Sequence, residues 1–228
     1  MRIDIWSDVV CPWCYLGKRR FEAAIAELGW QDTVEIRWRA YLLDPTATSE
    51  PQDLRAAIER KYGPGAFDGM TRRLTALGEP EGITYRFDTA LRVGTLDAHR
   101  LLAWAYATAG ATIQDALKER LLGAYFEHGA NVADHATLAG LAAEVGLDRG
   151  EAGQILTTGA YRAEVAEDLQ AAAEREITGV PGFVIADRLL IPGAQDVETF
   201  VALLTRARER FGSGSSVESD DASEGERC

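Results

Sequence analysis

Residues 3–14 read Ile-Asp-Ile-Trp-Ser-Asp-Val-Val-Cys-Pro-Trp-Cys, and this stretch decides the fold that we expect. The alternating run at residues 3–6 predicts a short strand, and residues 18–28, which contain no Gly or Pro, predict a helix. Cys11 and Cys14 therefore lie where a strand ends and a helix begins. Unpaired N–H groups and the helix dipole stabilise a thiolate at that place.

This arrangement is typical of a thiol–disulfide site. Pro12 suits the first helical turn, where its missing N–H is not needed. Cys14 follows Cys11 by nearly one turn, so the two side chains are neighbours and can form a disulfide. We expect Cys11 to be the exposed attacking thiol with a low pKa, and Cys14 to be the buried partner that resolves a mixed disulfide.

Two other uses of a Cys-x-x-Cys pair suit this chain less well. A zinc site needs about four ligands, usually from two such pairs, but the third cysteine is the terminal Cys228. The histidines show no paired ligand spacing; they are His99, His128 and His135. A structural disulfide stabilises least when the loop that it closes is short. The pattern therefore favours redox chemistry and no metal site.

Length and composition limit the class of protein. A chain of 228 residues, 46% of them hydrophobic, can bury a full core. The net charge of −12 disfavours nucleic acid as a partner, because phosphates repel it. The sequence contains neither an apolar run long enough to span a membrane nor the pattern of a secretory signal. We therefore expect a cytoplasmic protein, and in that reducing compartment such a cysteine pair is more often catalytic than structural.

Periodicity and turn residues predict a sheet that is interrupted by helices. The predicted strands are 3–6, 34–39, 183–185 and 189–191. After the first helix, the predicted helices are 53–62, 66–77, 96–109, 113–128, 135–145, 162–176 and 197–211, with caps expected from Thr95, Asp134 and Asp196. The α/β domain would thus comprise residues 1–44 and 159–211, with a helical insertion domain at 45–158. Residues 212–228 are expected to form a disordered acidic tail.

A second motif, Thr-Gly-Val-Pro-Gly at residues 178–182, comes directly before a predicted strand. A proline at the start of a strand is permissible on structural grounds alone. Together with the cysteine pair, however, Pro181 looks like the cis-proline loop of thioredoxin folds. In that interpretation the Val180–Pro181 bond is cis, and the backbone of Val180 faces Cys11 and binds a peptide or thiol.

Five blocks of sequence carry a more specific likeness: residues 7–21, 95–101, 124–126 with Gly129, 179–181 and 191–195. Together they resemble DsbA-family proteins of the FrnE-like branch. The resemblance implies an α/β thioredoxin fold with a large all-helical insertion domain, and thiol–disulfide oxidoreductase activity. The chain departs from the pattern at Gly94, where Asn is expected, and at Gly182, where the branch often carries a bulkier residue.

The resemblance also implies roles for particular residues. Cys11 and Cys14 would be catalytic, and the residues expected to contact substrate are Pro12, Trp13, Val180 and Pro181. No bound cofactor is implied. The expected partners are protein thiols and disulfides or low-molecular-weight thiols, with glutathione as a possible co-substrate.

Two other functional classes stay open. Relatives of this branch include 2-hydroxychromene-2-carboxylate isomerases and kappa-class glutathione transferases, which carry a serine where this chain has Cys11. A serine cannot form a disulfide, so the two cysteines favour redox turnover over isomerisation. A redox-regulated binding protein or holdase is the third class.

Several other residues are interpreted as structural. The basic run of Lys18, Arg19 and Arg20 is expected to be mainly a solvated helix face, and His99 a buried residue whose hydrogen bonds are satisfied. Trp38 and Tyr41 are expected in the core rather than in a substrate groove. Cys228 is interpreted as a spare thiol.

Overall fold

A four-stranded mixed sheet lies at the centre of residues 1–211, which are the part of the chain described by this computed structural model. The strand order is β2-β1-β5-β6, with β1 (Arg2–Ser7), β2 (Glu35–Ala40), β5 (Gly182–Ile185) and β6 (Leu189–Pro192). β1 is parallel to β2 and antiparallel to β5, and β5 and β6 form an antiparallel hairpin. The predicted acidic tail and Cys228 lie outside the described residues.

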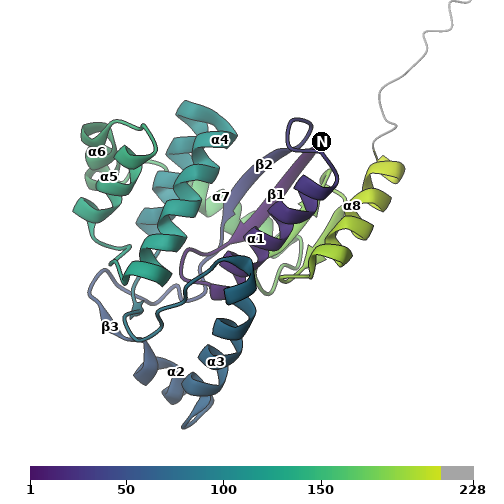
Figure 1. The fold of residues 1–228 in the computed structure, drawn as a ribbon. Coiled ribbons are helices and arrows are strands. Elements are labelled where there is room, and N and C mark those ends of the chain that lie inside the picture. The colour runs from purple at the N-terminus through teal and green to yellow at the C-terminus, as the bar shows by residue number, and fades with distance from the viewer. Residues whose placement is uncertain (212–228) are drawn as a thin grey trace, which may run out of the picture.

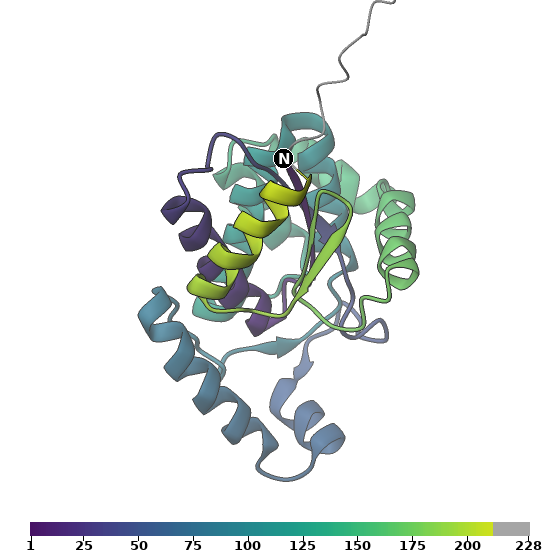
Figure 2. The same cartoon turned by 90° about the vertical axis from the view of Figure 1, so that its right-hand side faces the viewer.

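Helices cover both faces of this sheet (Figure 2). They are α1 (Pro12–Glu27) and α8 (Val197–Phe211), side by side on one face, and α7 (Arg162–Glu174) on the other. The alternation along β1 explains this arrangement. Ile3 and Ile5 pack with Phe21 of α1, whereas Trp6 packs with Ala172 of α7. Because both faces are covered, nearly the whole of β1 is buried.

The chain between β2 and α7 is mostly helical (Figure 1). It contains β3 (Gln52–Asp53), α2 (Leu54–Tyr62), α3 (Ala66–Gly78), the short 3-10 helix η1 (Glu79–Glu81), β4 (Leu91–Arg92), α4 (Leu96–His128), α5 (His135–Glu144) and α6 (Arg149–Thr158). α4 lies against β2, and α5 and α6 pack against α4. No helix within residues 1–211 is long and apolar enough to cross a bilayer.

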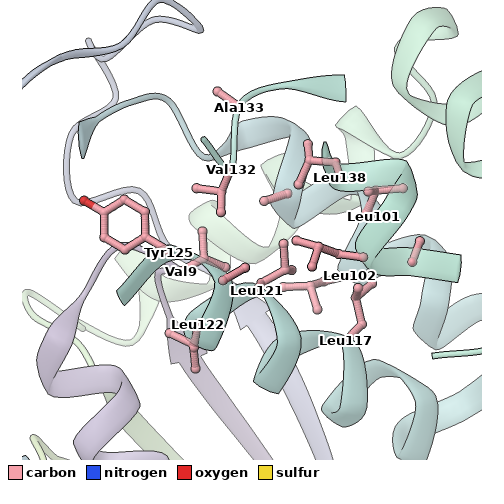
Figure 3. Close-up of a cluster of buried hydrophobic side chains, with 14 of the residues drawn as sticks. Val9, Leu101, Leu102, Leu117, Leu121, Leu122, Tyr125, Val132, Ala133 and Leu138 are labelled. Atoms are coloured by element: carbon pink, nitrogen blue, oxygen red, sulfur yellow. The ribbon is translucent and has the colours of Figure 1, made fainter. Parts of the chain in front are cut away.

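A large apolar cluster joins the helical segment, residues 45–158, to the chain around the cysteines (Figure 3). Val9, which follows β1, lies among Leu102 and Leu121 of α4, with Val132 and Leu138 nearby. Each of these side chains is at most 3% exposed. The helical segment therefore shares a core with the start of the chain.

Side chains from two helices occupy the outer edge of β2. The side chain of Gln114 in α4 accepts the N–H of Trp38 at 2.9 Å and donates to its carbonyl at 2.9 Å. The carboxylate of Asp168 in α7 accepts the N–H of Ala40 at 2.9 Å. These bonds satisfy backbone groups that a sheet edge otherwise leaves unpaired.

The structure corrects two details of the predicted helices. α6 was not predicted, because Gly150 and Gly153 lower the helix propensity of residues 149–158. Thr95 precedes α4 but its side chain makes no capping hydrogen bond, so that predicted cap is wrong. Asp134 and Asp196 do accept the N–H groups of the residues three positions on, as predicted.

Candidate active site

Cys11 and Cys14 lie in the first turn of α1. Cys11 is the N-cap residue, with an extended backbone (φ −92°, ψ 111°), and Pro12 follows at the start of the helix. The N–H of Cys14 donates to the Cys11 carbonyl at 3.0 Å. The hydroxyl of Tyr85 donates to the Pro12 carbonyl at 2.6 Å and so fixes this turn to the helical segment. Both cysteines are free thiols.

The loop that carries Pro181 lies against Cys11. The Cys11 thiol donates to the carbonyl of Val180 across 3.7 Å, and the Val180–Pro181 peptide bond is cis. Cys11 is only 3% exposed, so the prediction of an exposed thiol is wrong. The cause is the close approach of this loop, which the sequence predicted to face Cys11 but not to cover it.

Cys14 differs sharply from Cys11 in its surroundings. It is completely buried, as predicted. Burial raises the pKa of Cys14 well above its usual value, and the hydrogen bond with Cys11 raises it further. Cys14 is therefore held as a thiol and needs a proton acceptor before it can act as a nucleophile.

An apolar groove opens beside Cys11. It has a volume of about 380 Å³, and Cys11, Pro12 and Trp13 line it together with residues of α2 and α3. Most of its other lining residues are apolar, and three of them are exposed large side chains: Leu43, Tyr62 and Met70. Val180 and Pro181 are not among the lining residues. The groove gives an apolar group access to the Cys11 side of the turn.

Asp8 and His99 form a buried pair next to the cysteines. Nε2 of His99 lies 3.3 Å from Oδ1 of Asp8, and the N–H of Leu43 donates to Oδ2 of Asp8 at 2.9 Å. Burial works to raise the pKa of Asp8, but the hydrogen bond and charge of His99 and the Leu43 N–H hold it below its ordinary value. His99 is thus a buried residue with a partner, as the sequence favoured.

Comparison with known proteins identifies the family. The model of the DsbA-like thioredoxin domain matches residues 2–205. The chain belongs to this family. The DsbA-like match and the sheet described above confirm the predicted α/β thioredoxin fold with inserted helices.

Solved structures of similar chains agree with this assignment. The chain is 35% identical to the probable DsbA oxidoreductase SCO1869 from Streptomyces coelicolor, with a TM-score of 0.86 over 97% of this chain and 94% of that one. Two more distant structures share the fold. One is a 2-hydroxychromene-2-carboxylate isomerase (18% identity, TM-score 0.66, 95% and 100% covered). The other is the cytosolic disulfide reductase DsbM from Pseudomonas aeruginosa, solved with GSH (19% identity, TM-score 0.65, 92% and 100% covered). All three structures therefore share the DsbA-like fold of this chain.

The basic run of this DsbA-like chain is not a solvated face, so that prediction is wrong. Lys18 is 2% exposed and lies 3.1 Å from Asp115 and 3.3 Å from Glu119. Arg19 pairs with the same Glu119 at 2.6 Å, and Arg20 pairs with a glutamate of η1. The reason is that Asp115 and Glu119 of α4 face α1. Their carboxylates pair with the basic side chains, which therefore do not extend into water.

The remaining sequence candidates fall in packed positions. Trp38 is 4% exposed and Tyr41 packs against the small cluster around Trp6, and neither lines the groove beside Cys11. A Cβ on Gly94 would come within 2.7 Å of the Ala47 carbonyl, so Asn does not fit this backbone without a shift. A Cβ on Gly182 would lie 3.2 Å from a methyl group of Ile177, so this position is tight rather than open.

Sequence reasoning missed one charged residue of the site, Lys118. It lies in α4, is 0% exposed, and its Nζ has no hydrogen-bond partner within the described residues. A signal was present in the sequence. Residues 114, 117, 118, 121, 122 and 125 recur at helical spacing and form one buried stripe, in which Lys118 is the only charged side chain.

Proposed function

We propose that this DsbA-like protein is a thiol–disulfide oxidoreductase that cycles between a Cys11–Cys14 dithiol and disulfide. The observation that carries the proposal is the unequal pair of free thiols in the first turn of α1. Cys11 borders an apolar groove, whereas Cys14 is sealed behind it. Such an asymmetric pair supports one thiol that attacks and a second that resolves.

The reaction follows from this asymmetry. The Cys11 thiolate attacks one sulfur of a substrate disulfide, forms a mixed disulfide and releases the other sulfur as a thiolate. Cys14 then attacks Cys11 Sγ, which forms the internal disulfide and releases the reduced substrate. The substrate gains two electrons and the cysteine pair loses them. A thiol reductant returns the pair to its starting state through the reverse exchange.

The chemistry of the groove and the structural neighbours indicate which classes of substrate and reductant the protein uses. An apolar groove beside Cys11 suits an apolar group attached to the reacting sulfur, in a peptide or in a small thiol. The structure of the cytosolic disulfide reductase DsbM contains GSH. We therefore favour a cytoplasmic site of action and glutathione or a similar thiol as reductant. Pro12, Trp13, Val180 and Pro181 are proposed to contact the bound substrate.

Substitution of each cysteine tests this function. Cys11→Ser should abolish disulfide exchange, because the attacking sulfur is lost. Cys14→Ala should keep the attack but accumulate mixed disulfides, because resolution is lost. Insulin reduction gives the turnover, and mass spectrometry of the non-reduced protein gives the trapped adduct.

Two further measurements decide between the functional classes. Iodoacetamide should alkylate Cys11 faster than Cys14 at mildly acidic pH, whereas equal rates or faster reaction at Cys14 would contradict the assigned roles. Isomerisation of 2-hydroxychromene-2-carboxylate is measured in parallel. Isomerase activity that survives Cys14→Ala, without insulin reduction by the unaltered protein, would favour the isomerase class. Absence of both activities from the unaltered protein would leave a binding role.

A further inference from the structure

Lys118 is a buried cation that the proposed reaction has not yet used. Its Nζ makes no hydrogen bond within residues 1–211 and lies 5.4 Å from the ring centroid of Trp38. An ammonium group without a partner in a protein interior is costly and is retained at few positions. Stability therefore does not explain why a lysine occupies position 118.

The charged and titratable groups that act on Lys118 include Cys14 of α1, the N-cap residue Cys11, Asp8 after β1, and Lys18 of α1. Asp8 is already engaged by His99 and the Leu43 N–H. Lys18 is engaged by Asp115 and other carboxylates. Cys14 exerts the largest of the charge interactions with Lys118.

We propose that Lys118 is the proton acceptor for the Cys14 thiol when the mixed disulfide is resolved. This inference rests on the proposed oxidoreductase function and assigns a part of it to a helix of the inserted segment. Cys14 is completely buried, so its proton is closed off from bulk solvent, and Lys118 Nζ is a buried nitrogen without a hydrogen-bond partner among residues 1–211. Burial lowers the pKa of Lys118 to about 8, so the neutral amine is accessible near neutral pH.

The step balances as follows. The neutral Lys118 amine takes the proton of the Cys14 thiol and becomes an ammonium. The Cys14 thiolate attacks Cys11 Sγ, so the bond between the two cysteines forms and the bond from Cys11 to the substrate sulfur breaks. The substrate leaves as a thiolate that takes a proton from water, and Lys118 later returns its proton to solvent. In the reverse direction the ammonium protonates Cys14 as it leaves.

The experiment follows the two thiolates released from the aromatic disulfide DTNB by an equimolar amount of reduced protein. All variants carry Cys228→Ser, so that only Cys11 and Cys14 react. The first release reports attack by Cys11 and the second reports resolution by Cys14; a Cys14→Ala chain should show only the first. We expect Lys118→Met to leave the first release within about threefold and to slow the second about a hundredfold at neutral pH. The pH midpoint of the second release should rise.

Lys18→Met is the matched control, because Lys18 is also buried and lies 5.9 Å from the Trp38 ring centroid, but it faces carboxylates. It should lower the melting temperature and shift the pH midpoint of the second release much less than Lys118→Met does. Lys118→Met should melt at the same or a higher temperature, because an unpaired buried charge is removed. An unchanged second release in folded Lys118→Met, or an equal pH shift in Lys18→Met, would overturn the proposal. Absence of a second release from the Cys228→Ser parent chain would instead refute the oxidoreductase function itself.

Discussion

Gly17 lies where α1 meets the loop that carries Pro181. A Cβ at this position would come within 2.8 Å of Pro181 Cγ and 3.3 Å of Ala194 Cβ. Only a residue without a side chain lets the loop approach this closely. The approach in turn places the Val180 carbonyl within reach of the Cys11 thiol. The absence of a side chain at Gly17 therefore determines how closely the Val180 carbonyl approaches Cys11 Sγ.

Gly17→Ala should push the Pro181 loop away from α1. We expect the free energy of unfolding to fall by about 1–3 kcal/mol, as for other overpacked cores, and the first thiolate release from DTNB to change in rate. Chemical denaturation and stopped-flow absorbance measure the two effects. Gly123→Ala is the control, because its Cβ would meet the Tyr15 hydroxyl at an ordinary 3.6 Å. Equal behaviour of the two variants would contradict the role given to Gly17.

At the scale of elements, α4 is bent at a single residue. Gly110 has φ 81° and ψ −175°, whereas the rest of the element is helical. The break lets the first half of α4 carry His99 to Asp8, while the second half carries Gln114 to β2 and Lys118 toward Cys14. The conformation at Gly110 is one that L side chains rarely adopt.

Gly110→Ala should lower the free energy of unfolding by about 1–3 kcal/mol through backbone strain alone. No atom beyond the adjacent residues and the backbone of α4 itself lies within 4 Å of a Cβ at this position, so crowding by other parts of the molecule makes no contribution. Gly153→Ala in α6 is the matched control, since it is equally open but helical. That control should gain about 0.5–1 kcal/mol. A Gly110→Ala variant as stable as the parent in urea denaturation would show that α4 can straighten.

The elements also show which features a sequence can predict. The cysteine pair, the strands around it and the interruption of α4 at Gly110 all follow from local spacing and from glycine, which act within a few residues. α6 was missed because contacts with α4 and α5, rather than its own propensity, hold it. The burial of Cys11, the pairing of Lys18 and the place of Lys118 depend on residues about 100 positions or more away, so local patterns could not predict them.

At the scale of the whole molecule, Gln114 ties the inserted helices to the sheet. We expect Gln114→Leu to leave the N–H and the carbonyl of Trp38 without partners, at a cost of about 1–3 kcal/mol for each group. Thermal and urea unfolding measure the loss. Gln170→Leu, on the exposed side of α7, should change the free energy of unfolding by less than about 0.5 kcal/mol. Similar losses in both variants would mean that the edge contacts of Gln114 contribute little.

Because Gln114 of α4 covers the backbone edge of β2, the inserted helices cannot be removed without exposing the sheet. A shortened protein that joined residue 44 to residue 159 would keep all four strands of the central sheet, but it would lose Gln114 and most of the apolar neighbours of Val9. Asp168 would still accept the N–H of Ala40. The N–H and the carbonyl of Trp38, however, would be free to pair with a strand of another molecule. We expect such a minimal protein to self-associate through that strand, so the smallest soluble unit of this design includes its helices.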